Sequence, residues 1–361
     1  MAKEVRVAIA GVGNCASALV QGVEYYKKVK ASTKVPGLMH VNFGGYHIRD
    51  VKFVAAFDVN KNKIAKDLAD AIWVEPNVCA RFGKVVPKTG VKVSPGPILD
   101  GVAPHMKQPF HTYNEKQMKP TDVAETLRET KADVLVNFIP VGSKKATQVY
   151  AEACLKAKCA LANCIPEFIA SNPKWAKRFE NAGLPVAGDD VKSQLGATIL
   201  HRNIARLCVD RGVEVDETYQ LNLGGDTDFL NMTVEERLHT KRISKTEAVT
   251  SLLPYKVPTR IGPSDYVPFL GDKKICYIYL QGRKFCNRPV TVTAKLEVED
   301  SPNSAGVVID VVRAVKIALD RGVSGALTGI SSYAFKHPPI QVPDSEARQW
   351  VEDFIQGKRQ Q

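Results

Sequence analysis

The sequence contains no apolar run close to the roughly 18 residues that a membrane-spanning helix needs. It also lacks a C-x-x-C pair and an H-E-x-x-H motif, so these redox and zinc signatures are missing. No internal repeat is apparent, which argues against a solenoid or a propeller. The amino end, Met1-Ala2-Lys3-Glu4, leads directly into a strand pattern. We therefore expect no export signal, a cytoplasmic location, and eight cysteines that are free thiols.

The composition is that of a folded, basic protein. Its 361 residues are 44% hydrophobic, which is enough for a large core and favours two domains. The net charge of +12 could attract nucleic acid, a membrane surface or a small phosphorylated substrate. No nucleic-acid motif is visible and the lysines form no single amphipathic stripe. We therefore expect neither nucleic acid nor a membrane as a partner.

Short apolar runs alternate with helical patterns over the first half of the chain. Strands are expected at 5–10, 51–57, 133–139, 159–163 and 184–187, and helices at 17–28, 121–130, 144–157 and 173–182. This alternation predicts a parallel sheet covered on both faces. Residues 30–50 are expected to form a long inserted loop. Residues 81–120 carry seven basic residues, two acidic residues and six prolines, which predicts irregular structure over most of their length.

The pattern changes after residue 211. Segments 213–223, 274–280 and 290–298 alternate polar and apolar residues, as half-exposed antiparallel strands do. Strong helical patterns cover 303–320 and 344–355. These features predict a second, α+β unit inserted into the first.

A dinucleotide-binding fingerprint follows the first expected strand. Gly11 permits a tight turn, Gly13 lets the backbone approach a pyrophosphate, and Ala16 lets the helix pack closely on the strand. Asp58 ends the next long strand, where a carboxylate would hold the ribose hydroxyls and favour NAD over NADP. It lies 45 residues after Gly13 rather than about 20, and the inserted loop accounts for the difference. The alternative is a tight turn in an unliganded domain.

A second group of polar residues, 189–198, lies between a strand and a long helix that ends near residue 211. Lys192, Ser193, Gly196 and Thr198 could offer charge, hydroxyls and free amides to a phosphate. An ordinary helix cap is the alternative. The two adjacent carboxylates, Asp189 and Asp190, exceed what capping requires.

Several lysines are dispersed along the second half of the chain. Lys241 and Lys245 lie four residues apart, on one face if that segment is helical. Lys274 lies at a turn that leads into a strand pattern, and Lys336 follows the last strand–helix unit. Taken singly, each lysine is typical of solvated surface. Gathered in one pocket, such lysines could act as bases and stabilise an enolate or an alkoxide.

Taken together in order, these motifs resemble one family. They are the fingerprint, D-D-x-K-S at 189–193, N-L-G-G-D-T-D-F at 222–229, K-x-x-x-K at 241–245, D-Y-V-P-F-L-G-D-K-K at 265–274, E-D-S-P-N-S-A-G at 299–306 and K-H-P-P at 336–339. The chain resembles the myo-inositol-1-phosphate synthase family in its bacterial and archaeal form, over nearly its whole length. In eukaryotic members the D-D block continues S-G-Q-T, so the phosphate contacts here are expected one or two residues away from that pattern.

The resemblance implies an activity. The family converts D-glucose 6-phosphate to 1L-myo-inositol 1-phosphate with tightly held NAD and no net redox change. Oxidation at C5 acidifies C6, the C6 enolate attacks the C1 aldehyde, and the ring ketone is then reduced. Some members are stimulated by ammonium and others by divalent metal. The sequence shows no clean ligand cluster, so the metal question stays open.

The resemblance also implies roles for residues. The catalytic set is Lys241, Lys245, Lys274, Lys336, Asp190 and Asp228; Lys241 and Lys336 are assigned to proton transfer and charge stabilisation. Lys245 and Lys274 are assigned to the phosphate and the C1 oxygen, with Lys192, Ser193, Gly196 and Thr198. The cofactor set is Gly11, Gly13, Asn14, Cys15, Ala16, Asp58, Asn137, Pro166, Asp190 and Asp310, although Asp310 could equally be an acid at a domain seam.

The expected architecture is a Rossmann-type NAD-binding domain, residues 1–195 plus 306–361, with an inserted α+β catalytic and oligomerisation domain, residues 196–305. The resemblance implies a homotetramer built on the inserted sheet. Two other functions stay open. One is an NAD(P)-dependent dehydrogenase of the homoserine dehydrogenase type. The other is an inactive NAD-binding regulator that binds nucleic acid through residues 81–120.

Overall fold

The structure is a computed structural model that describes residues 3–83 and 85–361. Met1 and Ala2, on which the expected absence of an export signal partly rests, lie outside this range. Within the described residues, no helix has both the length and the apolar character to cross a membrane.

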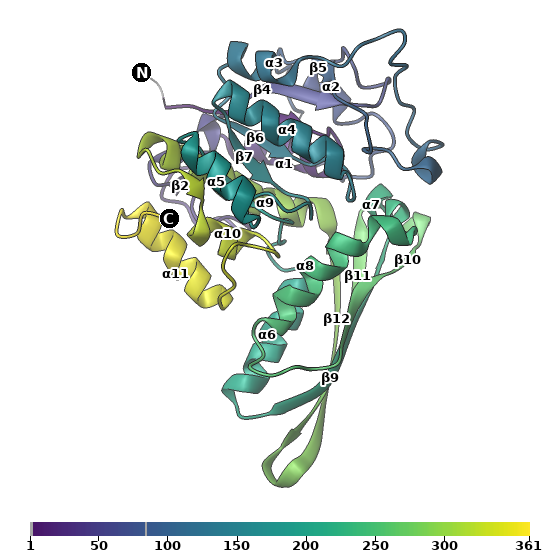
Figure 1. Cartoon of the computed structure of the whole chain (residues 1–361), viewed down its shortest axis with the longest axis vertical. Helices are drawn as coiled ribbons and strands as arrows, with labels where there is room; N and C mark the ends of the chain where they lie inside the picture. Colours follow the sequence, from purple (N-terminus) through teal and green to yellow (C-terminus); the bar gives the residue numbers. More distant parts are fainter. Residues whose placement is uncertain (1–2, 84) are drawn as a thin grey trace.

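A seven-stranded, entirely parallel sheet forms the centre of the larger unit (Figure 1). From edge to edge the order is β13-β8-β7-β6-β1-β4-β5. The strands are β1 (Val5–Ala10), β4 (Val51–Asp58), β5 (Val93–Pro95), β6 (Val134–Asn137), β7 (Ala160–Asn163), β8 (Pro185–Gly188) and β13 (Gly325–Ala326). The chain moves outward from β1 through β4 to β5 and then crosses to β6. This switch point opens a crevice at the carboxyl ends of the strands, where α/β proteins bind ligands.

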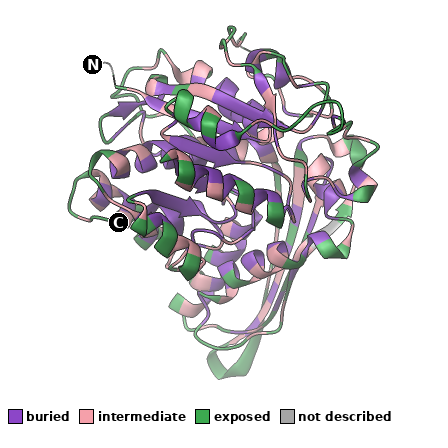
Figure 2. Ribbon diagram, turned by 45° about the horizontal axis from the view of Figure 1, so that its top comes forward, coloured by how far each residue is buried: buried purple, intermediate pink, exposed green. Residues whose placement is uncertain are grey.

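Helices cover both faces of this sheet, because its strands are apolar on both sides. One face carries α1 (Asn14–Tyr26), α2 (Leu68–Ala71), α9 (Asp300–Asp320), α10 (Thr328–Ala334) and α11 (Asp344–Ile355). The other carries α3 (Val123–Glu129), α4 (Lys144–Ala157) and α5 (Pro173–Asn181). The strands appear as a buried layer between exposed helix surfaces in Figure 2. The predicted Rossmann-type fold is confirmed.

A second, four-stranded sheet extends away from the first (Figure 1). Its order is β10-β9-β11-β12, with β9 (Glu214–Gly224), β10 (Thr259–Tyr266), β11 (Lys273–Lys284) and β12 (Arg288–Glu299). Helices α6 (Ala197–Asp210) and α8 (His239–Thr250) pack on one face through a cluster that includes Ala205, Val249 and Leu280. The short helix α7 (Thr227–Asn231) follows β9. The three predicted strands are confirmed, whereas β10 was not predicted and runs parallel to β9.

The predicted loop at 30–50 is more ordered than expected. It contains a small hairpin, β2 (Asn42–Phe43) and β3 (Tyr46–His47), followed by the one-turn helix η1 (Ile48–Asp50). Arg313 of α9 is fully buried and donates to the backbone carbonyls of His40, Val41 and Tyr46. A single buried guanidinium thus provides hydrogen-bond donors for the backbone carbonyls of a segment that has little regular structure of its own.

The proline-rich segment 81–120 is mostly irregular, as predicted. It nevertheless supplies the edge strand β5 and the one-turn helix η2 (Pro104–Met106). Asp100 lies in this segment and accepts the backbone N–H groups of Lys145 and Ala146 at 2.7 and 2.9 Å. The segment therefore caps the amino end of α4 and lies against the crevice of the main sheet.

Candidate active site

One pocket lies at the carboxyl ends of the central strands and continues to the second sheet. Its described lining includes the fingerprint residues Gly11, Gly13, Asn14 and Cys15, together with Asp58. It also includes the four dispersed lysines Lys241, Lys245, Lys274 and Lys336, with Asp190 and Asp228. Residues separated by up to 325 positions in the chain thus share one cavity.

The glycine turn has the geometry of a pyrophosphate cradle. Gly11 has φ +88°, and a Cβ added there would lie 2.7 Å from the carbonyl oxygen of Phe138, so only glycine fits this turn. A Cβ added at Gly13 would meet nothing within 4 Å, which leaves open space in front of the backbone. No side chain caps the amino end of α1, so its N–H groups are available to an anion. These features fit NAD.

Asp58 holds the same turn from the neighbouring strand. Its carboxylate accepts the backbone N–H groups of Val12 and Asn60, both at 2.7 Å. Lys63, which is buried, donates to the carbonyl oxygen of Val12 at 2.6 Å, and burial lowers its pKa. Asp58 and Lys63 therefore fix the backbone between the two glycines. Lys63 also lines the pocket, although no motif in the sequence marks it.

Asp190 is the centre of the opposite half of the pocket. The side chain is buried, and its Oδ1 lies 3.0 Å from Lys336 Nζ and 3.4 Å from Lys241 Nζ. Ser244 donates to the other carboxylate oxygen. Burial opposes ionisation of Asp190, but the two ammonium groups outweigh it and hold its pKa well below the usual range. Asp190 is therefore a carboxylate that joins two lysines from different parts of the chain.

A short backbone ladder brings Asp190 and Lys336 together. The N–H of Lys336 donates to the carbonyl of Asp190 at 2.7 Å, and the N–H of Lys192 donates to the carbonyl of Ala334 at 2.7 Å. Val191 and Phe335 face each other across this antiparallel bridge. The D-D-x-K and K-H-P-P motifs are thus neighbours through main-chain hydrogen bonds, which their separation in sequence does not reveal.

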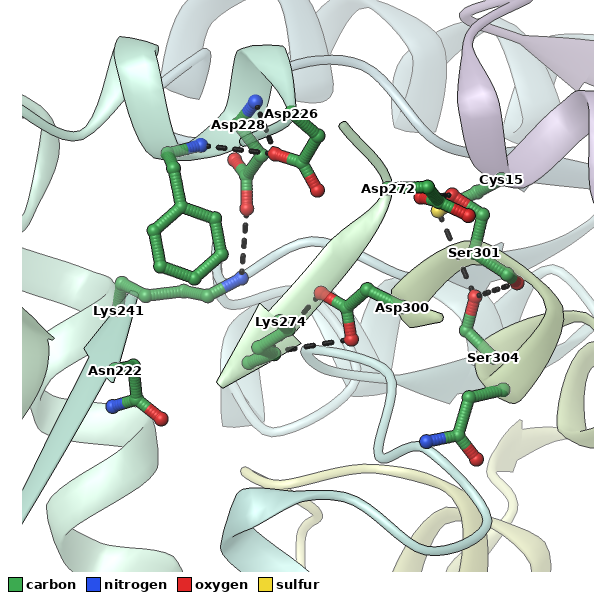
Figure 3. A network of polar contacts seen from close by, with 12 residues as sticks. Cys15, Asn222, Asp226, Asp228, Lys241, Asp272, Lys274, Asp300, Ser301 and Ser304 are labelled. Carbon is green, nitrogen blue, oxygen red and sulfur yellow. Dashed lines mark hydrogen bonds and ion pairs between the residues drawn. The ribbon is translucent and has the colours of Figure 1, made fainter. Parts of the chain in front are cut away.

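The remaining lysines differ in their partners. Lys241 also lies 3.7 Å from Asp228, and although burial opposes it, the carboxylates of Asp190 and Asp228 raise its pKa. Lys274 pairs with Asp300 at 3.1 Å and has a raised pKa for the same reason (Figure 3). Within the described part of the chain, Lys245 has no carboxylate at ion-pair distance. Burial and three neighbouring ammonium groups hold its pKa well below the ordinary value.

Two buried acids, Asp226 and Asp272, belong to the polar network around Lys241 and Lys274 (Figure 3). Asp226 accepts the N–H groups of Asp228 and Phe229, and burial with the nearby Asp228 carboxylate raises its pKa to about 7. Asp272 accepts the hydroxyl of Ser301 at 2.6 Å, and burial raises its pKa to about 7 as well. Among residues 3–83 and 85–361, no group of three histidine, cysteine or carboxylate side chains has the arrangement of a metal site.

Comparisons with known proteins point to one family. The family profile of Myo-inositol-1-phosphate synthase matches residues 196–301. The chain is 53% identical to the Inositol-3-phosphate synthase of Corynebacterium glutamicum, over 97% of this chain and 98% of that protein. The chain belongs to the myo-inositol-1-phosphate synthase family.

Further members extend the comparison to solved structures. The Inositol-3-phosphate synthase of Mycolicibacterium smegmatis is 52% identical over 99% of both chains. A myo-inositol-1-phosphate synthase-related protein from Thermotoga maritima superposes with a TM-score of 0.81 at 26% identity, and 98% of each chain is covered. The synthase of Caenorhabditis elegans, at 14% identity, has a TM-score of 0.74 over 98% of this chain and 86% of its own, and it shows the shared fold.

The predicted phosphate segment of this synthase-family chain divides into two parts. Ser193 lines the pocket, whereas Lys192, Gly196 and Thr198 are not among its described lining residues. Lys192 is fully buried and donates to Asp344 at 2.7 Å and to the carbonyl of Ser332 at 2.9 Å. Gly196 precedes the first residue of α6, and Thr198 is buried in its first turn. The geometry therefore favours Ser193 over Lys192 as a phosphate contact.

The predicted cofactor residues divide in the same way. Asp310 does not face the described pocket: it accepts the N–H of Met39 at 3.0 Å and pairs with Arg313, so it corresponds to the alternative of an acid at a seam. Asn137 is fully buried and donates to Asn163 at 2.9 Å. Pro166 and Ala16 are buried, and neither is among the described lining residues. Ala16 still fits its predicted role in close helix packing.

Proposed function

We propose that this chain performs the family reaction, the NAD-dependent conversion of D-glucose 6-phosphate to 1L-myo-inositol 1-phosphate, in the pocket described above. The observation that carries the proposal is the convergence of four lysines and Asp190 beside the glycine turn. A reaction that passes through an enolate and an alkoxide needs several cations around one sugar, and it needs them next to a hydride acceptor.

NAD would be held by the glycine turn, the amino end of α1 and Asp58. Each oxygen of the Asp58 carboxylate already accepts one backbone N–H, from Val12 and from Asn60, and each can accept a further donor such as a ribose hydroxyl. When bound, NAD supplies the acceptor for the C5 hydride and returns that hydride at the end. Cys15 faces this part of the pocket as an uncharged thiol, because burial raises its pKa to about 12.

Lys336, Lys241 and Asp190 are the groups proposed to act at C5. The shared carboxylate fixes both amines within 3.4 Å of one oxygen. Burial lowers the pKa of Lys336 and so favours its neutral amine, which would accept the proton that leaves the C5 hydroxyl. The positive charge of Lys241, which the carboxylates of Asp190 and Asp228 maintain, would then stabilise the oxygen of the C5 ketone and of the enolate derived from it. Asp228 orients Lys241 from the other side.

Lys245 and Lys274 complete the cation set. The resemblance assigns them to the phosphate and to the C1 oxygen. Lys274 carries its charge beside Asp300, which suits an aldehyde oxygen that becomes an alkoxide. Lys245 is desolvated and surrounded by other ammonium groups, which disfavour its charged form. A bound phosphate would offset their repulsion and stabilise the Lys245 ammonium. Ser193 would add a hydroxyl to the same anion.

The assembly proposed is a homotetramer formed by the domain of residues 196–305, with residues 1–195 and 306–361 as the NAD-binding domain. One face of the second sheet exposes Tyr219, Leu221 and Tyr277 by 41%, 42% and 39%, on the side away from α6 and α8. The rings of Tyr219 and Tyr279 stack on this face with their centroids 4.9 Å apart. An apolar sheet face of this kind is typical of an interface between subunits. Dissociation of the assembly by Leu221→Lys, seen in sedimentation, would test it.

All eight cysteines are free thiols, which suits the proposed cytoplasmic location. An activating monovalent or divalent cation is a further part of the family expectation. We assign no residue to it, because the described residues offer no ligand group of the usual kind.

One assay separates the proposal from its alternatives. The protein is incubated with glucose 6-phosphate and NAD+, inositol phosphate is followed by phosphorus NMR, and absorbance is recorded at 340 nm. The synthase forms product without net NADH, whereas a homoserine dehydrogenase-type enzyme accumulates NADH from another substrate. An inactive nucleic-acid-binding regulator forms no product and binds nucleic acid with a steep salt dependence. Lys241→Ala and Lys336→Ala should abolish turnover while NAD stays bound.

A further inference from the structure

We propose that Arg237 is a positioning residue that sets the lysine-bearing helix α8 against the cofactor side of the pocket. Arg237 ends the one-turn helix η3 (Glu235–Arg237), which leads into α8 and therefore into Lys241 and Lys245. It is only 9% exposed, although it follows two glutamates in a segment that looks like solvated surface in the sequence. The inference rests on the proposed roles of Lys241 and Lys245.

The guanidinium of Arg237 contacts the loops that form the cofactor wall. Its Nη1 donates to the carbonyl of Asp100 at 2.9 Å and to the carbonyl of Gly142 at 2.8 Å. Its Nη2 lies 3.5 Å from the hydroxyl of Ser143, at the start of α4. Gly142 has φ +80°, and a Cβ added there would lie 2.9 Å from Arg237 Nε. The close approach of this loop to Arg237 therefore depends on glycine.

A second contact ties the same guanidinium to α7. Its Nε donates to Oδ1 of Asn231 at 3.2 Å, and Nδ2 of Asn231 donates to the carbonyl of Val141 at 3.0 Å. Asn231 and Val141 both line the pocket. Val141 also joins Met232 and Leu238 in a small buried apolar cluster beside the guanidinium. Charge, hydrogen bonds and apolar packing thus converge on one junction between the two halves of the site.

The contacts have a direct consequence for the cofactor wall. Asp100 caps α4 with its carboxylate while its carbonyl accepts from Arg237, so both ends of this residue are fixed. The adjacent Gly101 and Val102 line the pocket, as does Pro140 on the other loop. Removing the guanidinium leaves two partly buried carbonyls without their donor and frees η3 to shift. Such a shift displaces Lys241 relative to the cofactor, and small displacements of a catalytic group are costly for rate.

The test uses Arg237→Ala and Arg237→Lys in the full chain, with Arg242→Ala as the matched control. Arg242 lies one turn further along and pairs with the exposed Glu235, so it offers the same charge without the buried contacts. Affinity for NAD is measured by calorimetry, and kcat and KM are measured by inositol phosphate formation. Because Arg237 donates hydrogen bonds as a charged group, we expect its removal to weaken NAD binding and to lower kcat, each by a factor in the range of about 10 to 100.

The expected pattern is specific to positioning. In Arg237→Ala the Kd for NAD should rise about tenfold and kcat should fall about 30-fold, while the KM for glucose 6-phosphate changes less than about threefold. Arg237→Lys should recover little, because one ammonium cannot reach all four acceptors. Millimolar methylguanidinium should restore part of the activity of Arg237→Ala, and methylammonium should not. Arg242→Ala should match the parent in every measurement.

Three results would overturn the inference. They are a folded Arg237 variant whose NAD Kd and kcat stay within about twofold of the parent, an equal loss in Arg242→Ala, and failure of both Arg237 variants to fold. In the last case the guanidinium serves folding alone. The NAD measurement does not use activity, so an error in the lysine assignments would be recognised separately, by full turnover in Lys241→Ala.

Discussion

The pairing of one buried carboxylate with two lysines leads to a quantitative prediction for Asp190→Asn. At 3.0 and 3.4 Å and an effective dielectric constant of about 20, each ammonium is attracted to Asp190 by about 5 kcal/mol before desolvation is counted. Removing one partner of a buried ion pair costs about 3–5 kcal/mol in practice. Expressed in the transition state, a loss of that size lowers kcat by about 200- to 5,000-fold.

The same substitution should change the pH dependence of turnover. Asparagine cannot hold the protons on Lys241 and Lys336. The pKa of Lys241 therefore falls from its raised value, and the pKa of Lys336, which burial already lowers, falls further. The alkaline limit of activity should therefore move to lower pH, with partial recovery of turnover on acidification. The assay is inositol phosphate formation between pH 6 and 9, with NAD affinity measured alongside.

The stability of Asp190→Asn follows from the direction of the pKa shift. The pKa of Asp190 is depressed in the folded protein, so its contribution is present above the unfolded pKa of about 3.9 and is lost as pH falls through the folded value. The variant should lose up to about 3–5 kcal/mol in urea unfolding at pH 7, and the difference should shrink below about pH 4.

Asp228→Asn is the matched control for these measurements. The Asp228 carboxylate lies 3.7 Å from Lys241 Nζ, and its side chain is 40% exposed. The free energy of unfolding should therefore fall by no more than about 1 kcal/mol in this variant. The reasoning is refuted if Asp190→Asn keeps kcat within tenfold of the parent and an unchanged alkaline limit.

Three further predictions concern the cofactor turn and the C-terminal helix. Asp58→Ala should raise the Kd for NAD by about tenfold, because the N–H of Val12 and the ribose both lose an acceptor; an unchanged Kd in calorimetry would contradict the ribose role. Gly11→Ala should destabilise the fold by more than about 2 kcal/mol and abolish NAD binding, because the new Cβ meets the carbonyl of Phe138, whereas wild-type melting would show that the turn tolerates a side chain. Asp344→Asn should lower the free energy of unfolding by about 3 kcal/mol, since it removes the carboxylate that neutralises the buried Lys192 ammonium, and calorimetric melting would decide it.

The central sheet could be predicted from the sequence because its signals are local. The run at Val5–Ala10, the glycine turn and the helix after it all lie within one continuous segment, and they were placed within a few residues of their observed bounds. The alternation in 213–223 and 290–298 was equally informative. Strand β10 was missed because Gly262 and Pro263 interrupt its pattern.

The site could be predicted only in part. The order of the motifs, through the family resemblance, identified the four lysines and Asp190 as site residues. No local signal in the sequence shows that Lys336 pairs with a residue 146 positions earlier. Lys192 was expected at a phosphate because a lysine beside serine and glycine suits an anion. It instead forms an ion pair with Asp344, which lies on a helix distant in the sequence. Arg237 was overlooked because an arginine after two glutamates is typical of a solvated turn.

The backbone ladder between residues 189–192 and 334–337 has a consequence for biosynthesis. Ribosomes deliver the chain from its amino end, so the strands that cradle the cofactor can assemble while Lys336 is still being made. A nascent or prematurely terminated polypeptide that ends before this lysine would hold the nucleotide pocket and three of the four amines, but would have no partner for Asp190 from the last segment. If Lys336 has its proposed role, turnover would therefore require the final stretch of translation.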